Sequence, residues 1–431
     1  MKKVMYAVAI LVVAVWGLTV VGHNPPMDVW WWRKQLINLT GLGSFVLMSL
    51  IMLLAVRPLW LEKRLHGLDK MYRLHKWAGI WAIALAIAHY GLKLSKSVLS
   101  EFFVRGAKEA RIETFLDAFR GAAKDLGEWS VWILGIMLVI TLWQRFPYHI
   151  WRYAHKILSV IYLLMAFHGI VLAPAGWWLE PAGVLLALVT VVGSYCAIVA
   201  LTGSIGRGRR YPGKVLRVKR HQGDVLEVTC QLPKSWSHRP GQFAFLTFDR
   251  FEGAHPFTVN SSDHADGQVS FAIKALGDYT SRLQTELDVG RKVIAEGPYG
   301  HFDLQLEGDS EQVWVAAGIG VTPFIAWLEA LQAQPERAPQ ATLYYCVNNT
   351  AEGVFAEKLQ RLAAAVPNVT LHVHCSDEQG HLCAEQALQG CAADTQVWFC
   401  GPQGFADALQ KGMQSLGYPA ENFHKEYFQM R

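Results

Sequence analysis

Two apolar stretches decide the fold of this chain: YRLHKWAGIWAIALAIAHY, residues 72–90, and YAHKILSVIYLLMAFHG, residues 153–169. Each is long enough, or nearly so, to cross a hydrocarbon core of about 30 Å as a helix. The first carries His75 and His89, and the second carries His155 and His168. Ionisable side chains inside membrane helices are costly and usually functional. The two stretches therefore predict a membrane domain with a site built on two of its helices.

The composition divides the chain into two halves. Of its 431 residues, 52% are hydrophobic and 17% are charged, against about 25% charged in a typical globular domain. Charged residues are scarce before about residue 205 and ordinary after it. This composition excludes disorder, collagen and coiled coil. The net charge of +5 is modest, and its basic residues cluster beside apolar runs, which indicates membrane orientation rather than nucleic-acid binding.

Apolar runs in the first half predict six membrane-spanning helices, near residues 4–22, 37–56, 76–94, 129–146, 153–173 and 180–202. The first run follows Met1-Lys2-Lys3, as a signal peptide would, but it has no clear small-residue cleavage site, so we interpret it as a retained helix. Basic loops near residues 57–76, 145–152 and 207–214 fall on one side, which should be cytoplasmic. The loop at about 96–128 mixes bases, acids and aromatic residues, and this pattern predicts an interfacial helix on the outer face.

The seven cysteines form no C-x-x-C motif, and their spacing fits neither a zinc site nor an iron–sulfur site. None lies in a segment predicted to be outside the membrane on the extracytoplasmic side. We expect a reducing compartment with free thiols around the second half. They are Cys196, Cys230, Cys346, Cys375, Cys383, Cys391 and Cys400.

The four histidines fall at two matched depths. His75 and His155 lie at the cytoplasmic ends of their helices, and His89 and His168 lie about 20 Å deeper by helical rise. Such a quartet can ligate two stacked haems, with one pair of imidazoles per iron. The alternative is a set of interfacial or hydrogen-bonded histidines. A step of 14 residues returns nearly to the same helix face and a step of 13 does not, so the second helix would need a kink, a bulge or a rotated haem.

In this quartet the chain resembles the ferric reductase-like transmembrane domain of the NADPH oxidase/ferric reductase family, where spacings of 13 and 14 are usual. The resemblance implies two b-type haems, an inner one on His75 and His155 and an outer one on His89 and His168.

The second half begins after a Gly- and Arg-rich break, GSIGRGRRYPGK. Apolar residues alternate with period two from about 212 to 300, which predicts a small antiparallel barrel. From about 310, apolar strands alternate with helical stretches, which predicts a parallel α/β sheet. We therefore expect a multi-domain membrane protein: a six-helix transmembrane bundle over 1–205, an antiparallel β-barrel over 206–305 and a parallel α/β nucleotide-binding domain over 306–431.

The motif HPFTVNSS, residues 255–262, followed by FAIKALGDYT, resembles the FAD-binding half of the ferredoxin reductase fold. The resemblance implies that Thr258 faces the isoalloxazine ring, with His255, Pro256 and Phe257 beside it. It also implies that Lys274 assists the anionic part of FAD and that Gly277 and Thr280 meet the pyrophosphate. Asn260 is an unusual insertion in this pattern.

The α/β domain opens with GPYG, which begins at Gly297, and continues with AAGIGVTPF. Gly318 and Gly320 after a strand allow a tight turn and close phosphate approach, and Pro323 suits a first helical turn. With Thr322, the motif resembles the G-x-G-x-T-P variant that binds nicotinamide dinucleotides. Its partner is FCGPQGF, with Cys400, Gly401 and Pro402, where the resemblance places Cys400 near the nicotinamide. The alternative for Cys400 is an inert buried cysteine.

Two further features concern the donor. The C-terminal FHKEYFQMR supplies an aromatic residue that would cover the flavin, Phe428 first and Tyr427 second; the alternative is an ordinary edge strand. NADPH-specific relatives usually carry an Arg after the second strand of this domain to pair with the 2′-phosphate. Here the stretch contains Asn348 and Asn349 with no adjacent Arg or Lys, so both NADPH and NADH stay open as donors.

These parts imply an order of electron carriers. A nicotinamide gives up two electrons as a hydride, a haem iron accepts one, and a flavin can do both. We therefore expect a multi-pass protein of the cell membrane, with cytoplasmic FAD and NAD(P) domains, that reduces oxygen or ferric iron outside. Thr258, Cys400 and Phe428 would position the reacting groups. The alternative is a membrane-anchored flavin reductase serving a cytoplasmic carrier or a partner redox protein. A transporter is disfavoured because no internal repeat is found.

Overall fold

The computed structural model describes residues 2–21, 28–104, 114–143, 146, 148–304, 306 and 310–426. The chain divides into two compact units, Met1–Ile205 and Gly206–Arg431. The first unit is helical and the second contains the two sheets.

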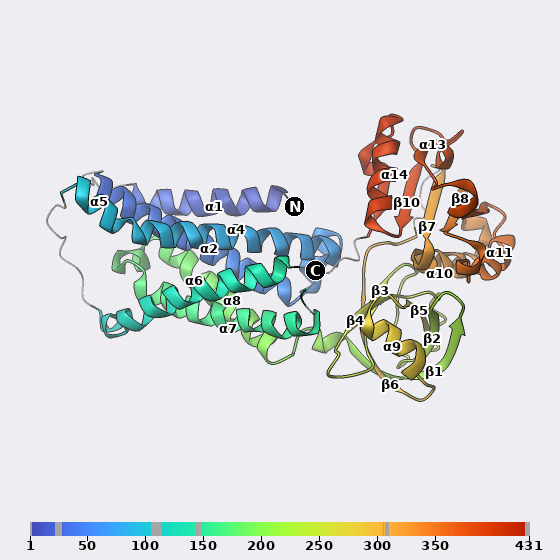
Figure 1. The fold of residues 1–431 in the computed structure, drawn as a ribbon, viewed down its shortest axis with the longest axis horizontal. Helices are drawn as coiled ribbons and strands as arrows, with labels where there is room; N and C mark the ends of the chain where they lie inside the picture. The colour runs from blue at the N-terminus through green and yellow to red at the C-terminus, as the bar shows by residue number, and fades with distance from the viewer. Residues whose placement is uncertain are drawn as a thin grey trace. The chain divides into compact units, whose positions relative to one another are not determined.

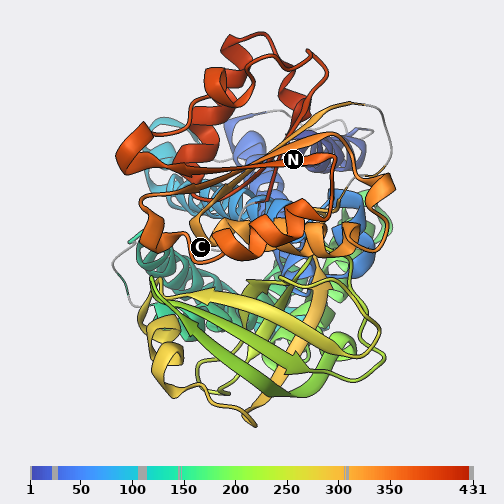
Figure 2. The same cartoon turned by 90° about the vertical axis from the view of Figure 1, so that its right-hand side faces the viewer.

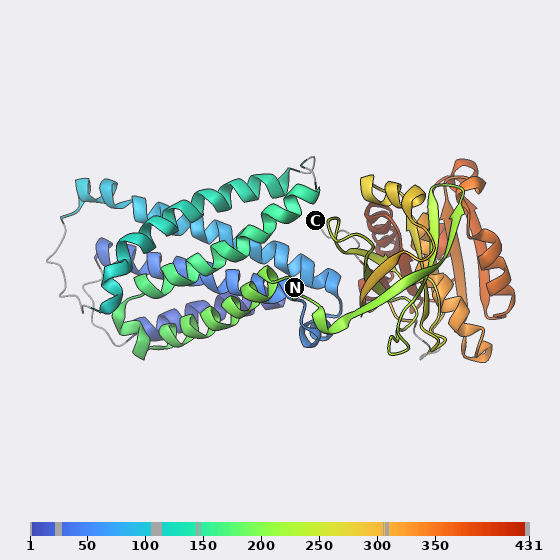
Figure 3. The same cartoon turned by 90° about the horizontal axis from the view of Figure 1, so that it is seen from below.

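Six helices of the described part of the first unit are long and apolar enough to cross a membrane, which confirms the prediction of a multi-pass membrane protein. The helices, including shorter ones, are α1 (Lys2–Val20), α2 (Val29–Ala55), α3 (Leu59–Leu65), α4 (Leu68–Leu94), α5 (Lys96–Phe102), α6 (Arg120–Leu142), α7 (Tyr148–Leu172) and α8 (Pro181–Leu201). Figures 1 and 3 show the long helices running alongside one another.

Helix α2 packs against α4 and α8, and α7 packs against α6 and α8. Phe45 of α2 stacks on Tyr162 of α7, with ring centroids 5.3 Å apart. The Tyr162 hydroxyl lies 2.8 Å from the Ser49 hydroxyl and donates to the Val189 carbonyl at 2.8 Å. Hydrogen bonds between helices stabilise bundles in lipid, where burying apolar surface adds little. This contact joins α2, α7 and α8.

The loop at 96–128 differs from the predicted interfacial helix. Helix α5 ends at Phe102, a 3-10 turn covers Phe115–Phe119, and α6 begins at Arg120. Residues 105–113 lie outside the described residues. On α6, Glu128 accepts hydrogen bonds from Lys93 and Tyr90 of α4, each at 3.0 Å. Helix α6 therefore starts about two turns before the predicted residue 129.

The barrel consists of β1 (Arg210–His221), β2 (Val225–Gln231), β3 (Phe243–Thr247), β4 (His255–Thr258), β5 (Gln268–Lys274) and β6 (Lys292–Tyr299), with α9 (Asp278–Glu286) between β5 and β6. The strand order is β4-β3-β6-β1-β2-β5, and every pair is antiparallel. A bridge from Val259 to Phe271 joins the two ends of the sheet. The sheet thus closes on itself, as the period-two alternation predicts.

The second sheet is parallel, in the order β11-β10-β7-β8-β9. Its elements are β7 (Gln312–Ala317), α10 (Thr322–Leu331), β8 (Ala341–Val347), α11 (Ala356–Ala364), β9 (Val369–Cys375), α12 (Ser376–Gln379), α13 (Ala384–Ala387), β10 (Gln396–Cys400), α14 (Gln403–Ser415) and β11 (Phe423–Lys425). One face packs on α10 and α11, and the other packs on α13 and α14 (Figure 2). Ligands of such sheets bind at the carboxyl ends of the strands.

Candidate functional site

The four predicted histidines form two facing pairs between α4 and α7. The ring centroids of His75 and His155 are 6.1 Å apart, and those of His89 and His168 are 6.3 Å apart. With metal–imidazole bonds of about 2 Å, two rings on opposite sides of one ion have centroids roughly 6 Å apart. Both pairs therefore fit an iron held between two imidazoles.

The 13-residue step on α7 does not require a break in the helix. Helix α7 is a continuous α-helix from Tyr148 to Leu172, with no π-helical turn between His155 and His168. The two pairs instead differ in the angle between their rings, 48° for His75 with His155 and 73° for His89 with His168.

Both histidines of the deeper pair are anchored by backbone carbonyls of a third and a fourth helix. The Nδ1 atom of His89 lies 2.9 Å from the Ile37 oxygen on α2, and that of His168 lies 2.7 Å from the Ala123 oxygen on α6. Because a carbonyl only accepts, each Nδ1 carries the proton and each Nε2 is left as the metal-binding atom. This arrangement is typical of histidines that bind metals.

The pair formed by His75 and His155 is anchored differently. His75 donates to the backbone of Ile51 on α2, whereas Nδ1 of His155 is buried without a partner among the described residues. The ring of His155 packs on Trp151, with centroids 4.8 Å apart. Three of the four imidazoles are thus oriented by a carbonyl, and His155 is oriented by packing.

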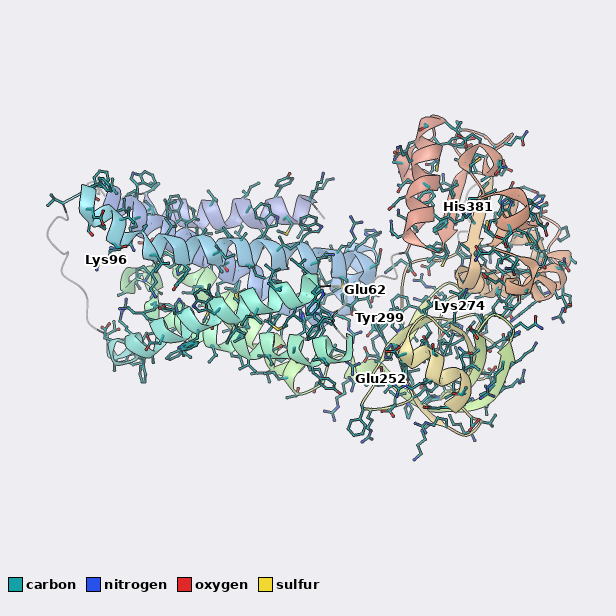
Figure 4. All side chains as sticks on the ribbon, viewed as in Figure 1. Glu62, Lys96, Glu252, Lys274, Tyr299 and His381 are labelled. Carbon is teal, nitrogen blue, oxygen red and sulfur yellow. The ribbon has the colours of Figure 1, made fainter. Side chains whose placement is uncertain are left out.

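The predicted flavin segment forms β4, with Pro256 and Phe257 paired to β3. His255 stacks on Tyr279 at the start of α9, with centroids 4.4 Å apart. Burial, followed by the carboxylate of Glu252, raises the pKa of Tyr279 to about 12. Figure 4 marks Glu252 and Lys274 on the barrel.

Gly277 and Thr280 form the turn before α9. The Thr280 hydroxyl accepts from the backbone N–H groups of Leu276 and Gly277, at 2.9 and 3.1 Å. It also donates to the Gly277 carbonyl at 3.1 Å. The hydroxyl therefore shapes the turn, and the contact of Gly277 and Thr280 with the pyrophosphate stays a prediction.

Asn260 belongs to a partly buried polar network that the sequence does not reveal. Asn260 is fully buried, and its side-chain nitrogen lies 3.4 Å from Glu227. Lys358 of α11 lies 3.4 Å from Glu227 and 3.0 Å from Glu329 of α10. The second oxygen of Glu329 accepts from the backbone N–H of Ser262 at 3.1 Å. This network, defined as Glu227, Asn260, Ser262, Glu329 and Lys358, joins the barrel to the α/β sheet. No motif signals it, because its members come from separate segments.

The Gly-rich turn follows β7 as predicted, and Pro323 lies in the first turn of α10. Gly318 has a φ of +54°, which favours glycine. Besides close approach to a phosphate, Gly320 has a second reason to be glycine: a Cβ there would overlap the carbonyl of Cys400. Thr322 is buried and donates to the Ile319 carbonyl at 3.1 Å.

The second nucleotide motif lies beside the first. Cys400 ends β10 and pairs in register with Ala316 of β7, and Gly401 packs against Ala317. Cys400 is buried, and its burial raises the pKa of its thiol. Gly401 and Pro402 connect β10 to α14. The structure thus brings the two motifs together at the carboxyl ends of adjacent parallel strands, where a nucleotide would bind.

One predicted residue belongs to the other sheet, and two lie outside the described residues. Gly297 belongs to β6, the barrel strand that pairs with β1 and β3, so GPYG completes the barrel and does not open the α/β sheet. Phe428 and Tyr427 lie outside the described residues.

Shortly after β8, where NADPH-specific relatives usually carry an Arg, the structure places the carboxylate of Glu352. The Asn348 amide donates to both carboxylate oxygens of Glu352, at 3.2 and 3.1 Å. Lys274 of the barrel lies 3.9 Å from Glu352. The sequence could not show the pairing of Lys274 with Glu352, because Lys274 comes from β5 of the barrel.

Comparisons with known proteins agree with this organisation. Residues 40–166 match the model for the ferric reductase like transmembrane component, 210–303 match an FAD-binding domain, and 314–411 match an oxidoreductase NAD-binding domain. With these three domains in this order, the chain matches the NADPH oxidase/ferric reductase family. The chain thus combines a multi-pass membrane domain with an FAD-binding domain and an NAD-binding domain of the oxidoreductase type.

Individual relatives cover only parts of the chain. It is 29% identical to respiratory burst oxidase homolog protein E of Arabidopsis thaliana over 206 residues, which are 42% of this chain and 21% of that protein. It is 31% identical to methane monooxygenase component C of Methylosinus trichosporium over 143 residues, 33% of this chain and 42% of that protein. A flavohemoglobin structure from Malassezia yamatoensis covers 78% of this chain and 91% of its own, at 18% identity and a TM-score of 0.48. The chain thus matches well under two thirds of either curated relative.

Proposed function

We propose that this protein transfers electrons from NAD(P)H across the membrane to an acceptor on the extracytoplasmic side. The family match supports the coarse activity, because it joins a ferric reductase-like membrane domain to FAD- and NAD-binding domains in one chain. The FAD and NAD domains lie on the cytoplasmic side in this proposal, as the basic loops favour.

The proposal depends mainly on one observation: four histidines form two facing pairs, one at each of two depths in the helix bundle. His75 with His155 and His89 with His168 have the ring separation that one iron between two imidazoles needs. By helical rise the two pairs are about 20 Å apart along α4. We assign the first pair to an inner b-type haem and the second to an outer one. Bound haem supplies one-electron transfer and bound FAD converts a two-electron hydride into single electrons.

The residues of the membrane unit hold and enclose these groups. His75 with His155, and His89 with His168, would each hold one haem through both imidazoles, and the group would supply one-electron transfer without a ligand from the acceptor. Oxygen and ferric iron both remain candidate acceptors, and the described residues favour neither.

The residues of the second unit position the donor against the flavin. The segment His255–Thr258 lies on β4, and the Gly318 turn and Cys400 meet at the carboxyl ends of β7 and β10. We propose that Thr258 contacts the flavin ring, that Cys400 lies by the nicotinamide and that Phe428 covers the flavin. No general base or covalent nucleophile is required, because the donor supplies the hydride itself.

Haem and flavin content of the purified protein tests this proposal. We expect two b-type haems and one FAD per chain, with a low-spin ferric spectrum, since two imidazoles give a strong axial field. Replacing His89 or His168 by Ala should remove the outer haem and leave FAD content unchanged. A preparation that reduces its flavin with NADH but holds no haem would favour the membrane-anchored flavin reductase instead.

A further inference from the structure

The two deeper histidines each lie against a glycine of a neighbouring helix. A Cβ built on Gly41 of α2 would stand 3.0 Å from Nδ1 and 3.1 Å from Cε1 of His89. A Cβ built on Gly127 of α6 would overlap the ring of His168, 2.5 Å from its Nδ1. Contacts under 3.0 Å require a shift of one partner, and the packed ring of a helix-borne histidine has little freedom to move.

The same geometry occurs twice. His89 bonds to the carbonyl of Ile37, four residues before Gly41, and His168 bonds to the carbonyl of Ala123, four residues before Gly127. In a helix the N–H of residue i+4 points at the carbonyl of residue i. A side chain at i+4 therefore stands beside the carbonyl that the imidazole must reach. Glycine at that position leaves the carbonyl open to the ring.

The arrangement distinguishes the deeper pair from the other pair. Among the described glycines, none presents its Cβ position to His75 or His155. Gly43 and Gly193 also pack closely, but against Leu85 and Tyr162, whereas Gly135 on α6 and Gly91 on α4 have no heavy atom within 4 Å of the added Cβ. Among the described glycines, only Gly41 and Gly127 place their Cβ position against a histidine of the quartet.

We propose that Gly41 and Gly127 are positioning residues for the outer haem. Each glycine, with the carbonyl one turn before it, fixes the Nδ1–H tautomer and the rotation of one imidazole, so that Nε2 faces the opposite ring. The proposal rests on the proposed function, since it requires a haem between His89 and His168. Carbonyl partners of metal-binding histidines are worth roughly 10–100-fold in metal affinity.

Alanine substitutions test the proposal, with matched controls in the same bundle. Gly127→Ala should displace His168 and weaken outer haem binding by roughly 10–100-fold, so that the haem-to-FAD ratio falls from two towards one. Gly41→Ala creates a milder overlap, so it should retain both haems and shift the low-spin electron paramagnetic resonance signal and midpoint potential of one of them. Gly135→Ala and Gly91→Ala should match the wild type in haem content, spectrum and potential.

The outcomes separate this proposal from the one it rests on. Wild-type protein without haem would remove the proposed function and this inference together. Two haems in the wild type, with unchanged haem content, resonance signal and potential in both Gly127→Ala and Gly41→Ala, would overturn this inference alone. If Gly127→Ala loses its FAD and does not fold, Gly41→Ala decides: a shifted signal from one haem supports the proposal, and a wild-type signal rejects it.

Discussion

The Cys400 thiol lies at the end of β10 and is 4% exposed. Burial raises the pKa of this thiol, so it stays protonated as the pH rises through the range of about 8–9 in which free thiols ionise. Cys400 therefore contributes a neutral, compact side chain at the proposed nicotinamide position and no thiolate.

Alkylation by iodoacetamide, read by peptide mass spectrometry, checks this prediction. Between pH 7 and 9, Cys400 in the folded protein should stay unmodified, because the thiolate is the reactive form and access is closed. The exposed Cys383 is the internal control, and it should be modified under the same conditions. Modification of Cys400 at the rate of Cys383 would show that the thiol is accessible and ionised.

Glu352 makes the donor preference testable. Its carboxylate, held by Asn348, would repel a 2′-phosphate at the end of β8. We expect higher kcat/KM for flavin reduction with NADH than with NADPH. Glu352→Arg should raise kcat/KM for NADPH by roughly tenfold, since one charge-assisted pair contributes about that much.

The charge control for Glu352→Arg is Glu378→Arg. Glu378 is an acidic residue on α12, which follows the neighbouring strand β9. If both substitutions raise NADPH use equally, the effect is one of overall charge and the assignment of Glu352 is wrong.

Residue types that the sequence identifies correctly can still have roles that only the fold reveals. Gly320 and Thr280 belong to nucleotide motifs and also have local roles. Gly320 leaves room for the Cys400 carbonyl, and the Thr280 hydroxyl accepts a hydrogen bond within its own turn. The sequence motif records that a small or hydroxyl residue is needed there. It does not record which neighbour imposes the need, because that neighbour comes from another segment.

The elements follow from hydrophobic periodicity where periodicity is strong. The six spans, the alternating barrel strands and the parallel strands were all predictable, because burial in lipid or between helices forces runs of apolar residues. The start of α6 at Arg120 was not predictable, since the ion pair between its Glu128 and Lys93 of α4 joins two separate helices. Prediction from composition alone cannot detect such pairs.

The network around Lys358 joins α10 and α11 to the barrel and predicts a change in stability. Burial raises the pKa of Glu227, but the charge of Lys358 and the hydrogen bonds of His221 and Asn260 outweigh it, so the pKa lies below its ordinary 4.5. A lowered pKa stabilises the fold above that pH, and the stabilisation is lost as the pH falls further through the folded-state pKa.

Lys358→Met should lower the free energy of unfolding of the second unit by about 1–3 kcal/mol at pH 7, because it leaves Glu227 and Glu329 without their shared cation. The loss should shrink as the pH falls below 4.5 and through the lowered pKa of Glu227, because a protonated carboxyl group needs no cation. Thermal unfolding of the full chain, followed by flavin release, measures both effects. The exposed Lys411→Met is the control; an equal loss in both variants would contradict a role for the network.

The whole chain joins a nucleotide-binding unit to a membrane unit whose four histidines face one another in pairs. The family resemblance predicted this organisation, and the matches confirm it. The tautomers and glycine contacts of the histidines were beyond sequence reasoning, because Ile37, Gly41, Ala123 and Gly127 lie on helices that carry none of the ligands. Their effect depends on how four helices pack together.

Trans reduction in sealed vesicles tests the transfer of electrons across the membrane most directly. The protein is reconstituted with its nucleotide domains outside, cytochrome c or a ferric chelate is trapped inside, and NADH or NADPH is added outside. We predict reduction of the trapped acceptor by the wild type and none by His89→Ala or His168→Ala, while flavin reduction by the same donor persists; superoxide dismutase inside then distinguishes oxygen from direct metal reduction. The account would be contradicted if both histidine variants reduced the trapped acceptor as well as the wild type does.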